Sequence, residues 1–237
     1  KITKYMKECY AGPLLKKEVE AINSVIKIKK EPVTCIIGGS KISTKINVIT
    51  SLIEKINNLI IVGAMANNFL VYKNFKVGKS LVENNTKEII KEIYKKAKEN
   101  NCEIIIPKDC MVGKSFEGKG ENKNLDKIED DEIILDIGLN TVSSINQIID
   151  QSNTVLWNGP AGYFENKNFA VGTKSIAENI SKNTLERSLI SVVGGGDTLS
   201  AINQSKDKLS FSHLSTAGGA FLEYLEGKDL PGLSVLK

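Results

Sequence analysis

Four times along the chain, a glycine-rich loop follows an apolar, strand-like run and leads into a helix-like pattern. The loops contain GGSK, WNGPAGYFE, GGGDT and STAGG, within residues 36–45, 154–165, 192–201 and 211–225. Parallel strands separated by helices bring such loops to one edge of a sheet, where open α/β folds bind their ligands. The repetition predicts an α/β fold: three αβα layers with a doubly wound, Rossmann-like parallel sheet of about six strands and helices on both faces.

The loop at 192–201 has the composition of a phosphate site. Glycine lets the main chain approach an anion without interference from Cβ, and the first turn of a helix offers free N–H groups. Gly195, Gly196 and Thr198 stand at this turn, and Asp197 adds a hard oxygen ligand of the kind that helps to hold Mg²⁺ on phosphates. We expect a mononucleotide with its Mg²⁺, because Leu199 stands where a dinucleotide fingerprint needs its third glycine.

Two lysines follow the first glycine loop. Apolar residues recur every three or four positions over 41–56, which predicts a helix that Ser40 caps and that begins with Lys41 and Lys45. Cations at a helix N-terminus cost about 0.3–1 kcal/mol each, so this pair favours a bound anion. The alternative is a pair of solvated surface lysines. The spacing is not that of a Walker A loop.

The loop at 154–165 offers polar groups to a nucleotide. Glu165 follows a tight turn, and its carboxylate can accept both hydroxyls of a ribose. Asn158 can donate from its amide to phosphate or support a metal-bound water. Trp157 and Phe164 are expected to pack in the core beneath the loop.

The loop in residues 211–225 presents a second helix N-terminus to an anion. Gly218 and Gly219 follow two hydroxyl side chains, Ser215 and Thr216, directly before an apolar helical pattern. This helix start is expected to face the same edge of the sheet.

The rest of the chain alternates strands and helices. Strands are expected at 32–37, 58–62, 102–106, 133–135, 153–156, 189–193 and 211–214, and the clearest helices at 41–56, 85–100 and 140–150. Asn85 and Glu88 have the spacing of a capping pair for the second of these helices. The polar, glycine-bearing segment 111–131 favours a surface hairpin or loop. Helical spacing of apolar residues within 1–28 predicts an N-terminal helix.

Composition limits the function classes. With 237 residues, 41% hydrophobic and 25% charged, the chain can bury a sizeable core. Its net charge of +4 comes from 32 basic and 28 acidic residues spread along the sequence, so nothing supports nucleic-acid binding. No apolar run approaches the roughly 20 residues of a membrane span. Cys9, Cys35, Cys102 and Cys110 lack paired spacing and are expected to be reduced thiols of a cytoplasmic protein.

These motifs resemble the phosphoglycerate kinase family, specifically its C-terminal, nucleotide-binding half. The resemblance covers nearly all of the chain and keeps the family's order: AGPLLKKEV, GGSKISTK, VGAMANNFL, VGKSL, WNGPAGYFE, GGGDT and HLSTAGGAFLEYLEGKDLPG. It implies phosphoryl transfer between 1,3-bisphosphoglycerate and ADP to give 3-phosphoglycerate and ATP, with Mg²⁺. The family's N-terminal half holds the three-carbon acid and supplies a catalytic arginine, whereas the only arginine of this chain is Arg187.

The resemblance assigns roles by position. Lys41 matches the lysine that steadies the transferring phosphoryl group, Lys45 one on the nucleotide phosphates, and Gly218 and Gly219 the helix start that faces that group on closure. The expected nucleotide contacts are Glu165 for the ribose, Asp197 for Mg²⁺, Gly195, Gly196 and Thr198 for the phosphates, and Gly39, Gly63, Leu81, Leu135, Pro160 and Tyr163 for the adenine, with Ser40 and Asn158 beside them.

The resemblance also implies a domain organisation. Residues 1–28 match an interdomain helix segment and residues 29–237 the nucleotide-binding domain of a monomeric two-domain kinase, which alone should bind nucleotide without turnover. Glu18 and His213 match a pair near the hinge, with a purely structural histidine as the alternative. The chain departs from the family's frequent glycines at Val62, Ala64, Ile134 and Ala217. These apolar side chains narrow the expected pocket and leave the charged phosphate groups intact.

Two rival functions use similar loops. A dinucleotide-dependent oxidoreductase would need an acidic residue after the second strand, where Ala64, Met65 and Ala66 stand instead. A non-catalytic ATP-binding module has the same sequence requirements as the nucleotide half of a kinase and stays open.

Overall fold

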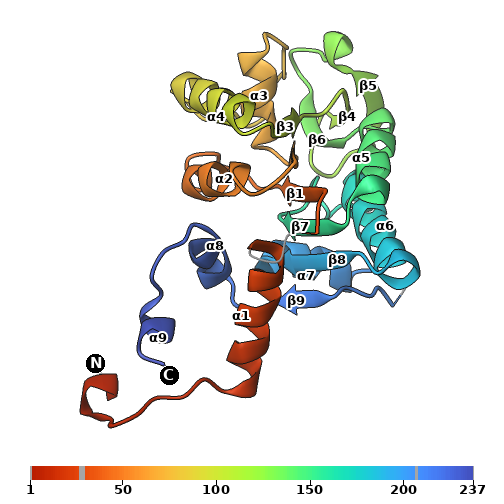
Figure 1. Cartoon of the computed structure of the whole chain (residues 1–237). Helices are drawn as coiled ribbons and strands as arrows, with labels where there is room; N and C mark the ends of the chain where they lie inside the picture. The colour runs from red at the N-terminus through yellow and green to blue at the C-terminus, as the bar shows by residue number, and fades with distance from the viewer. Residues whose placement is uncertain (1, 27–29, 206–207, 237) are drawn as a thin grey trace.

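The computed structural model describes residues 2–26, 30–205 and 208–236. At its centre lies a six-stranded sheet in the order β3-β2-β1-β7-β8-β9, in which every neighbouring pair is parallel (Figure 1). Its strands are β1 (Val33–Ile37), β2 (Asn58–Ile61), β3 (Glu103–Ile105), β7 (Thr154–Asn158), β8 (Ile190–Gly194) and β9 (His213–Ser215). The chain order reverses beside β1, as in doubly wound sheets, so the expected topology is confirmed.

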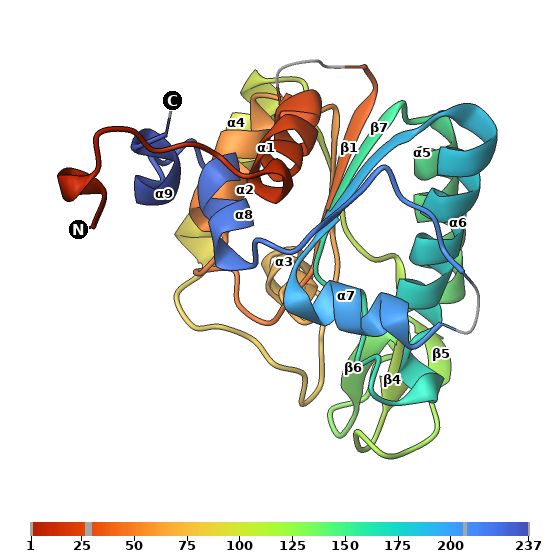
Figure 2. The ribbon, with the colours of Figure 1, turned by 90° about the horizontal axis from the view of Figure 1, so that it is seen from below.

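Helices cover both faces of this sheet (Figure 2). One face carries α1 (Pro13–Ile26), α2 (Ile46–Ile53), α3 (Ala66–Tyr72), α4 (Lys87–Glu99) and α8 (Gly219–Leu225), and the other carries α5 (Leu139–Gln151), α6 (Val171–Arg187) and α7 (Gly196–Asn203). Shorter helical segments are η1 (Ile2–Tyr5), η2 (Leu125–Lys127), η3 (Lys167–Phe169) and α9 (Pro231–Ser234). The predicted three-layer αβα arrangement is therefore confirmed.

The core has two halves because successive side chains of a strand point to opposite faces. Along β1, Cys35 and Ile37 belong to the cluster under α2 and α4, whereas Ile36 belongs to the cluster under α5 and α6. Trp157 is fully buried in the second cluster and Phe164 is 8% exposed, which confirms the prediction that both pack in the core.

A second, antiparallel sheet adjoins the carboxyl end of the first. It contains β4 (Asp109–Gly113), β5 (Glu121–Asn124) and β6 (Ile133–Ile137) in the order β5-β4-β6. The hairpin of β4 and β5 confirms the surface excursion expected at 111–131. The expectation that 133–135 alternates with the parallel strands is wrong, because β6 pairs antiparallel with β4 in the small sheet. Strand β4 itself follows β3 after only residues 106–108, whereas a parallel crossover needs about a dozen.

Two helix starts differ from the prediction. Helix α2 begins at Ile46, so residues 41–45 form a turn and Ser40 does not cap the helix; its N-cap position is Lys45, without a side-chain cap. Helix α4 begins at Lys87 after Thr86, and Asn85 takes a left-handed conformation with φ of 60° instead of capping. Helix α5 lies within one residue of its predicted bounds at both ends.

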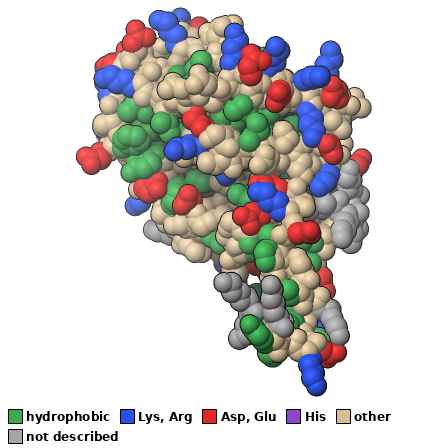
Figure 3. All heavy atoms as spheres, turned by 90° about the vertical axis from the view of Figure 1, so that its left-hand side faces the viewer, with side chains coloured by type: hydrophobic (Ala, Val, Ile, Leu, Met, Phe, Trp, Pro, Cys, Tyr) green, Lys and Arg blue, Asp and Glu red, His purple; other side chains and the backbone are tan. Residues whose placement is uncertain are grey.

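An N-terminal helix forms within the predicted segment, but it begins only at Pro13, since residues 6–12 are not helical; it buries Ile22 against the sheet. The predicted end of that segment at Ile28, and with it the domain boundary between residues 28 and 29, lies outside the described residues. Figure 3 shows positive and negative side chains interspersed over one face of the molecule, with no purely basic patch on it. No helix in the described ranges has the length and apolarity of a membrane span, and the cysteines are all free thiols.

Candidate functional site

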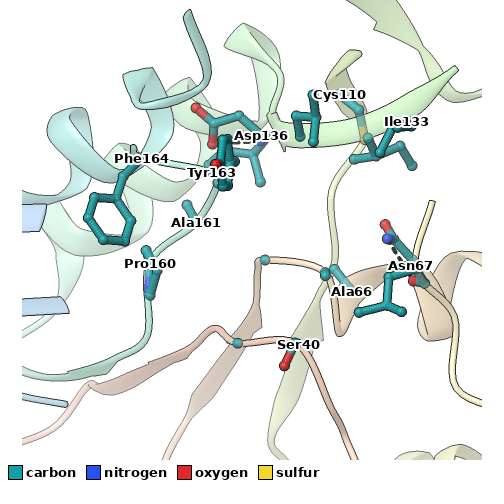
Figure 4. A pocket seen from close by; sticks show the side chains of 18 of the residues that line it. Ser40, Ala66, Asn67, Cys110, Ile133, Asp136, Pro160, Ala161, Tyr163 and Phe164 are labelled. Carbon is teal, nitrogen blue, oxygen red and sulfur yellow. Dashed lines mark hydrogen bonds between the residues drawn. The ribbon is translucent and has the colours of Figure 1, made fainter. Parts of the chain in front are cut away.

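The carboxyl edge of the parallel sheet opens into a cavity of about 500 Å³. Its walls come from the loops after β1, β2 and β7, from the start of α3 and from the small sheet (Figure 4). The residues expected at a nucleotide that line this cavity are Gly39, Ser40, Gly63, Leu81, Leu135, Pro160, Tyr163, Glu165 and Asp197. The topology of the sheet thus brings segments that lie far apart in sequence together around one cavity.

Glycine lets these loops lie close to each other. Gly63 adopts a φ of 68°, and a Cβ there would come within 2.8 Å of the Gly39 backbone nitrogen. A Cβ on Gly38 would lie 2.2 Å from the Pro160 carbonyl oxygen. Any larger residue would push the loops after β1, β2 and β7 apart and widen the cavity.

Lys45 connects the ends of three strands. Its Nζ donates to the Gly38 carbonyl and to Asn158 Oδ1, both at 2.7 Å, and Asn158 Nδ2 donates to the Gly194 carbonyl at 2.9 Å. Burial lowers the pKa of Lys45, while the neighbouring Cys35 and Asp197 oppose that shift. A half-buried ammonium group at the end of a sheet, with a carboxylate nearby, is suited to an anionic ligand with its metal.

Lys41 occupies a different position. It is exposed in the turn at 41–45, whereas Lys45 is partly buried; neither lysine is among the residues that line the cavity. Glu83 holds this turn: its carboxylate accepts from the Ser43 backbone N–H at 3.1 Å and from the Ser43 hydroxyl. The Thr44 hydroxyl also donates to the Lys41 carbonyl at 2.9 Å. Sequence reasoning missed Glu83, because no local pattern connects residues so far apart along the chain.

The loop after β8 forms the predicted helix start. Gly195 has a φ of 101° and precedes α7, whose first turn contains Asp197. The buried Thr198 hydroxyl accepts a hydrogen bond of 2.7 Å from the Gly159 backbone N–H, which ties this turn to the loop after β7. Nothing lies within 4 Å of a Cβ built on Gly196, so the N-terminus of α7 is open to a ligand.

Gly218 and Gly219 lie at the start of α8 but do not line the cavity. The loop before them is anchored by Glu18, which accepts from the Thr216 backbone N–H at 2.8 Å and lies 3.0 Å from His213 Nε2. Burial by itself raises the pKa of Glu18, but the hydrogen bonds from His213, Thr216 and Ser215 outweigh it and hold that pKa below its usual value. The expected pairing of Glu18 with His213 is confirmed as a contact.

Among the polar residues of the cavity wall, Asp136 and Asn67 were not predicted from the sequence. Asp136, at 2% exposure, accepts hydrogen bonds of 2.8 Å from the backbone N–H groups of Gly172 and Ile137. Asn67 lines the side formed by α3, away from Ala161 in the view of Figure 4. Both occur in apolar segments where periodicity predicts core packing, and only the fold brings them to the cavity.

Of the four positions where the family often has glycine and this chain has a larger residue, two line the cavity and two do not. Ala64 and Ile134 line the cavity, so their side chains take up space in it. Val62 is fully buried in the core, and Ala217 lies before α8 with its N–H 3.3 Å from the Ser215 hydroxyl. None of these side chains replaces a charged group around the cavity.

The arrangement fits a Mg²⁺ ion that is carried mainly by phosphates. Within the described ranges, no group of three or more His, Cys, Asp or Glu side chains could hold a metal ion alone. Asp197 instead offers one exposed carboxylate at the cavity and acts electrostatically on Lys45. Mg²⁺ keeps water and phosphate oxygens and needs only one or two carboxylates, so this donor set suits it.

Fold and site define this chain as a doubly wound α/β domain with its ligand cavity at the carboxyl edge of the parallel sheet. The family model for phosphoglycerate kinase matches residues 1–228. The chain belongs to the phosphoglycerate kinase family.

Individual relatives support this family assignment. A phosphoglycerate kinase of Chelativorans sp. is 43% identical over 230 residues, covering 96% of this chain and 58% of the relative. A solved phosphoglycerate kinase from Coxiella burnetii is 39% identical with a TM-score of 0.92, over 99% of this chain and 60% of that one. The enzyme from Pyrococcus horikoshii OT3 is 26% identical with a TM-score of 0.79, over 95% and 56%. The chain thus spans somewhat more than half the length of these relatives.

Proposed function

We propose that this chain is the nucleotide-binding half of a phosphoglycerate kinase and binds ADP or ATP with Mg²⁺. The observation that carries the proposal is the convergence of Gly39, Leu135, Tyr163, Glu165 and Asp197 on one cavity. An apolar wall suits the base, Glu165 the ribose hydroxyls, and Lys45 with the open N-terminus of α7 the phosphates. Asp197 would hold Mg²⁺, which neutralises charge on the phosphates when it is bound.

The reaction proposed for the complete protein is transfer of a phosphoryl group between 1,3-bisphosphoglycerate and ADP. Phosphoryl transfer depends on positioning and charge neutralisation more than on covalent catalysis. In this chain Lys41 would steady the transferring group, and Gly218 and Gly219 would offer backbone N–H groups to it when the two halves close. The three-carbon acid would be held by the N-terminal half in a monomeric, cytosolic enzyme.

Nucleotide titrations by calorimetry test this function. We expect the chain to bind MgADP and MgATP but not NAD, and Lys45→Ala to weaken MgADP binding by about tenfold or more, since it removes a charged donor. Asp197→Ala should weaken binding with Mg²⁺ present and have little effect without it. Lys91→Ala is the matched control, because Lys91 is an exposed lysine on α4 whose partner is Glu88. Binding of NAD without MgADP would contradict the proposal.

A non-catalytic nucleotide-binding module is the second candidate. It is favoured by the position of Lys41 and of the α8 start outside the cavity, since neither contributes to the wall. A coupled assay of the longer protein separates the two: a kinase turns over, and Lys41→Ala lowers kcat more than nucleotide affinity. A module would bind nucleotide equally well with and without Lys41 and show no turnover.

A further inference from the structure

Asn158 joins the ends of three parallel strands through its side-chain amide. It is the last residue of β7 and is 5% exposed. Its Oδ1 accepts from Lys45 Nζ at 2.7 Å, and its Nδ2 donates at 2.9 Å to the carbonyl of Gly194, the last residue of β8. Lys45 Nζ also donates at 2.7 Å to the carbonyl of Gly38, which directly follows β1. The amide therefore links the ends of β1, β7 and β8.

The two partners of this amide fix its orientation. An ammonium group can only donate and a carbonyl oxygen can only accept, so Oδ1 must face Lys45 and Nδ2 must face Gly194. Gly195 leaves the space for this arrangement, because a Cβ there would lie 2.8 Å from Asn158 Nδ2. Asn158 itself is not among the residues that line the cavity. Each end of the amide is thus engaged inside the protein.

The Lys45 ammonium group is held beside the cavity with one donor unused. It lies next to Gly39, which lines the cavity: a Cβ on Gly39 would be 3.4 Å from Lys45 Nζ. An ammonium group has three N–H donors, and within the described part of the chain Lys45 uses two, toward the Gly38 carbonyl and Asn158 Oδ1. A free lysine side chain populates many rotamers, so two fixed acceptors restrict where the third N–H points.

We propose that Asn158 is a positioning residue that acts on the nucleotide phosphates through Lys45. The inference rests on the proposed function, because it takes Lys45 as the cation that binds the phosphates. With the amide in place, the ammonium group is ordered before the nucleotide arrives, so less side-chain entropy is lost on binding. Without the amide, Lys45 keeps only the Gly38 carbonyl as an acceptor and must be ordered by the ligand. The sequence alone also allows Asn158 to contact phosphate directly, and that alternative makes a different prediction.

A double-mutant cycle on MgADP binding tests the proposal. The wild-type chain, Asn158→Leu, Lys45→Ala and the double variant are titrated with MgADP by calorimetry. We expect Asn158→Leu to weaken binding by about fivefold or more in the wild-type chain, the size of one lost hydrogen bond, and to change it by no more than about twofold in the Lys45→Ala background. A direct contact with phosphate, or a general distortion of the site, would cost the same factor in both backgrounds and would overturn the proposal.

NMR of the Lys45 ammonium group reports on its position directly. A hydrogen-bonded, partly buried ammonium group gives a proton–nitrogen signal that rapid exchange with water removes from free lysines. We expect this signal in the wild-type chain, assigned by its absence from Lys45→Ala, and its loss in Asn158→Leu. Asn158→Asp keeps the acceptor for Lys45 and loses the donor to Gly194, so it should keep the signal. An unchanged signal in Asn158→Leu, or its loss in Asn158→Asp, would refute the positioning role.

Asn183→Leu is the matched control for loss of a buried asparagine. Asn183 is 4% exposed, lies on α6 and does not line the cavity, and its amide also has a partner at each end: Nδ2 donates to Asp150 Oδ1 and Oδ1 accepts from Arg187. This variant should keep the Lys45 signal and an affinity for MgADP within about twofold of wild type. Failure of the wild-type chain to bind MgADP would overturn the proposed function, whereas binding without coupling between Asn158 and Lys45 would overturn only the present inference.

Discussion

Asp136 is a carboxyl group held inside the wall of the cavity. Burial raises its pKa to about 7, although backbone N–H groups of Gly172, Ile137 and Val171 oppose the shift. In the unfolded chain an aspartate titrates near pH 4, so between about pH 4 and pH 7 the folded protein binds the extra proton. The free energy of unfolding should therefore fall as the pH rises through this window, by roughly 1–4 kcal/mol.

Asp136→Asn isolates this contribution because the amide is nearly isosteric and does not titrate. Urea unfolding of both proteins at pH 5 and pH 8 gives the comparison, in which groups common to both cancel. We expect the stability of the wild-type chain, relative to the variant, to be lower at pH 8 than at pH 5. Parallel pH dependence in the two proteins would refute the assignment of this proton to Asp136.

Sequence reasoning found the residues of the site that lie in recognisable loops and missed those that reach the cavity from other elements. The glycine loops identified the cavity-lining Gly39, Glu165 and Asp197 through local composition. Asn67 and Asp136 belong to segments that are otherwise apolar, where the pattern predicts core. Their part in the site depends on the placement of α3 and β6, which local composition does not contain.

The turn at 41–45 is the element on which the position of Lys41 depends. It is not helical, and Glu83 supplies acceptors for the Ser43 N–H and hydroxyl. The hydrogen bond from the Ser43 hydroxyl lowers the pKa of Glu83; burial opposes this, and the backbone N–H groups of Ser43 and Ile42 add to it. Because the carboxylate form makes these contacts, their stabilisation is present above about pH 4 and is lost as the pH falls through the folded pKa.

Glu83→Ala should release this turn without unfolding the protein. The contact is largely exposed and solvent screens it, so we expect a loss of only about 0.5–1 kcal/mol in the free energy of unfolding. Amide hydrogen exchange at Ser43 should accelerate by about tenfold, while exchange in the buried strand β1 stays unchanged. Glu83→Gln keeps an acceptor oxygen and should restore much of the protection. Unchanged exchange at Ser43 in the alanine variant would contradict the role of Glu83.

At the scale of elements, the strands of the parallel sheet were the most predictable part of the fold. They are short apolar runs between glycine loops and helices, and burial on both faces makes them nearly continuous in hydrophobicity. The small sheet was only partly predictable. Its strand β5 reads ENKN and has mostly exposed side chains, so no hydrophobic pattern marks it. Its pairing depends instead on the short connection between β3 and β4, which prevents β4 from joining the parallel sheet.

At the scale of the whole molecule, the only arginine of the chain, Arg187, lies away from the cavity. Arg187 ends α6, directly before β8, and therefore lies toward the amino edge of the parallel sheet, opposite the loops that line the cavity. Its guanidinium group donates to the Asp150 carbonyl and, at 2.7 Å, to Asn183 Oδ1. Recognition of a small phosphorylated carboxylate usually relies on bidentate guanidinium contacts. This chain has no arginine available for them.

We therefore expect the isolated chain to bind MgADP and MgATP but to transfer no phosphoryl group to 3-phosphoglycerate. A coupled assay for ADP release with MgATP and 3-phosphoglycerate measures turnover, and calorimetry on the same preparation verifies that the nucleotide is bound. Adding 3-phosphoglycerate should leave the affinity for MgATP unchanged within about twofold, since no coupling between the two ligands is expected. Turnover above background that Lys41→Ala abolishes would show that the chain recognises the acid without arginine, and the division of labour proposed between the two halves would then be wrong.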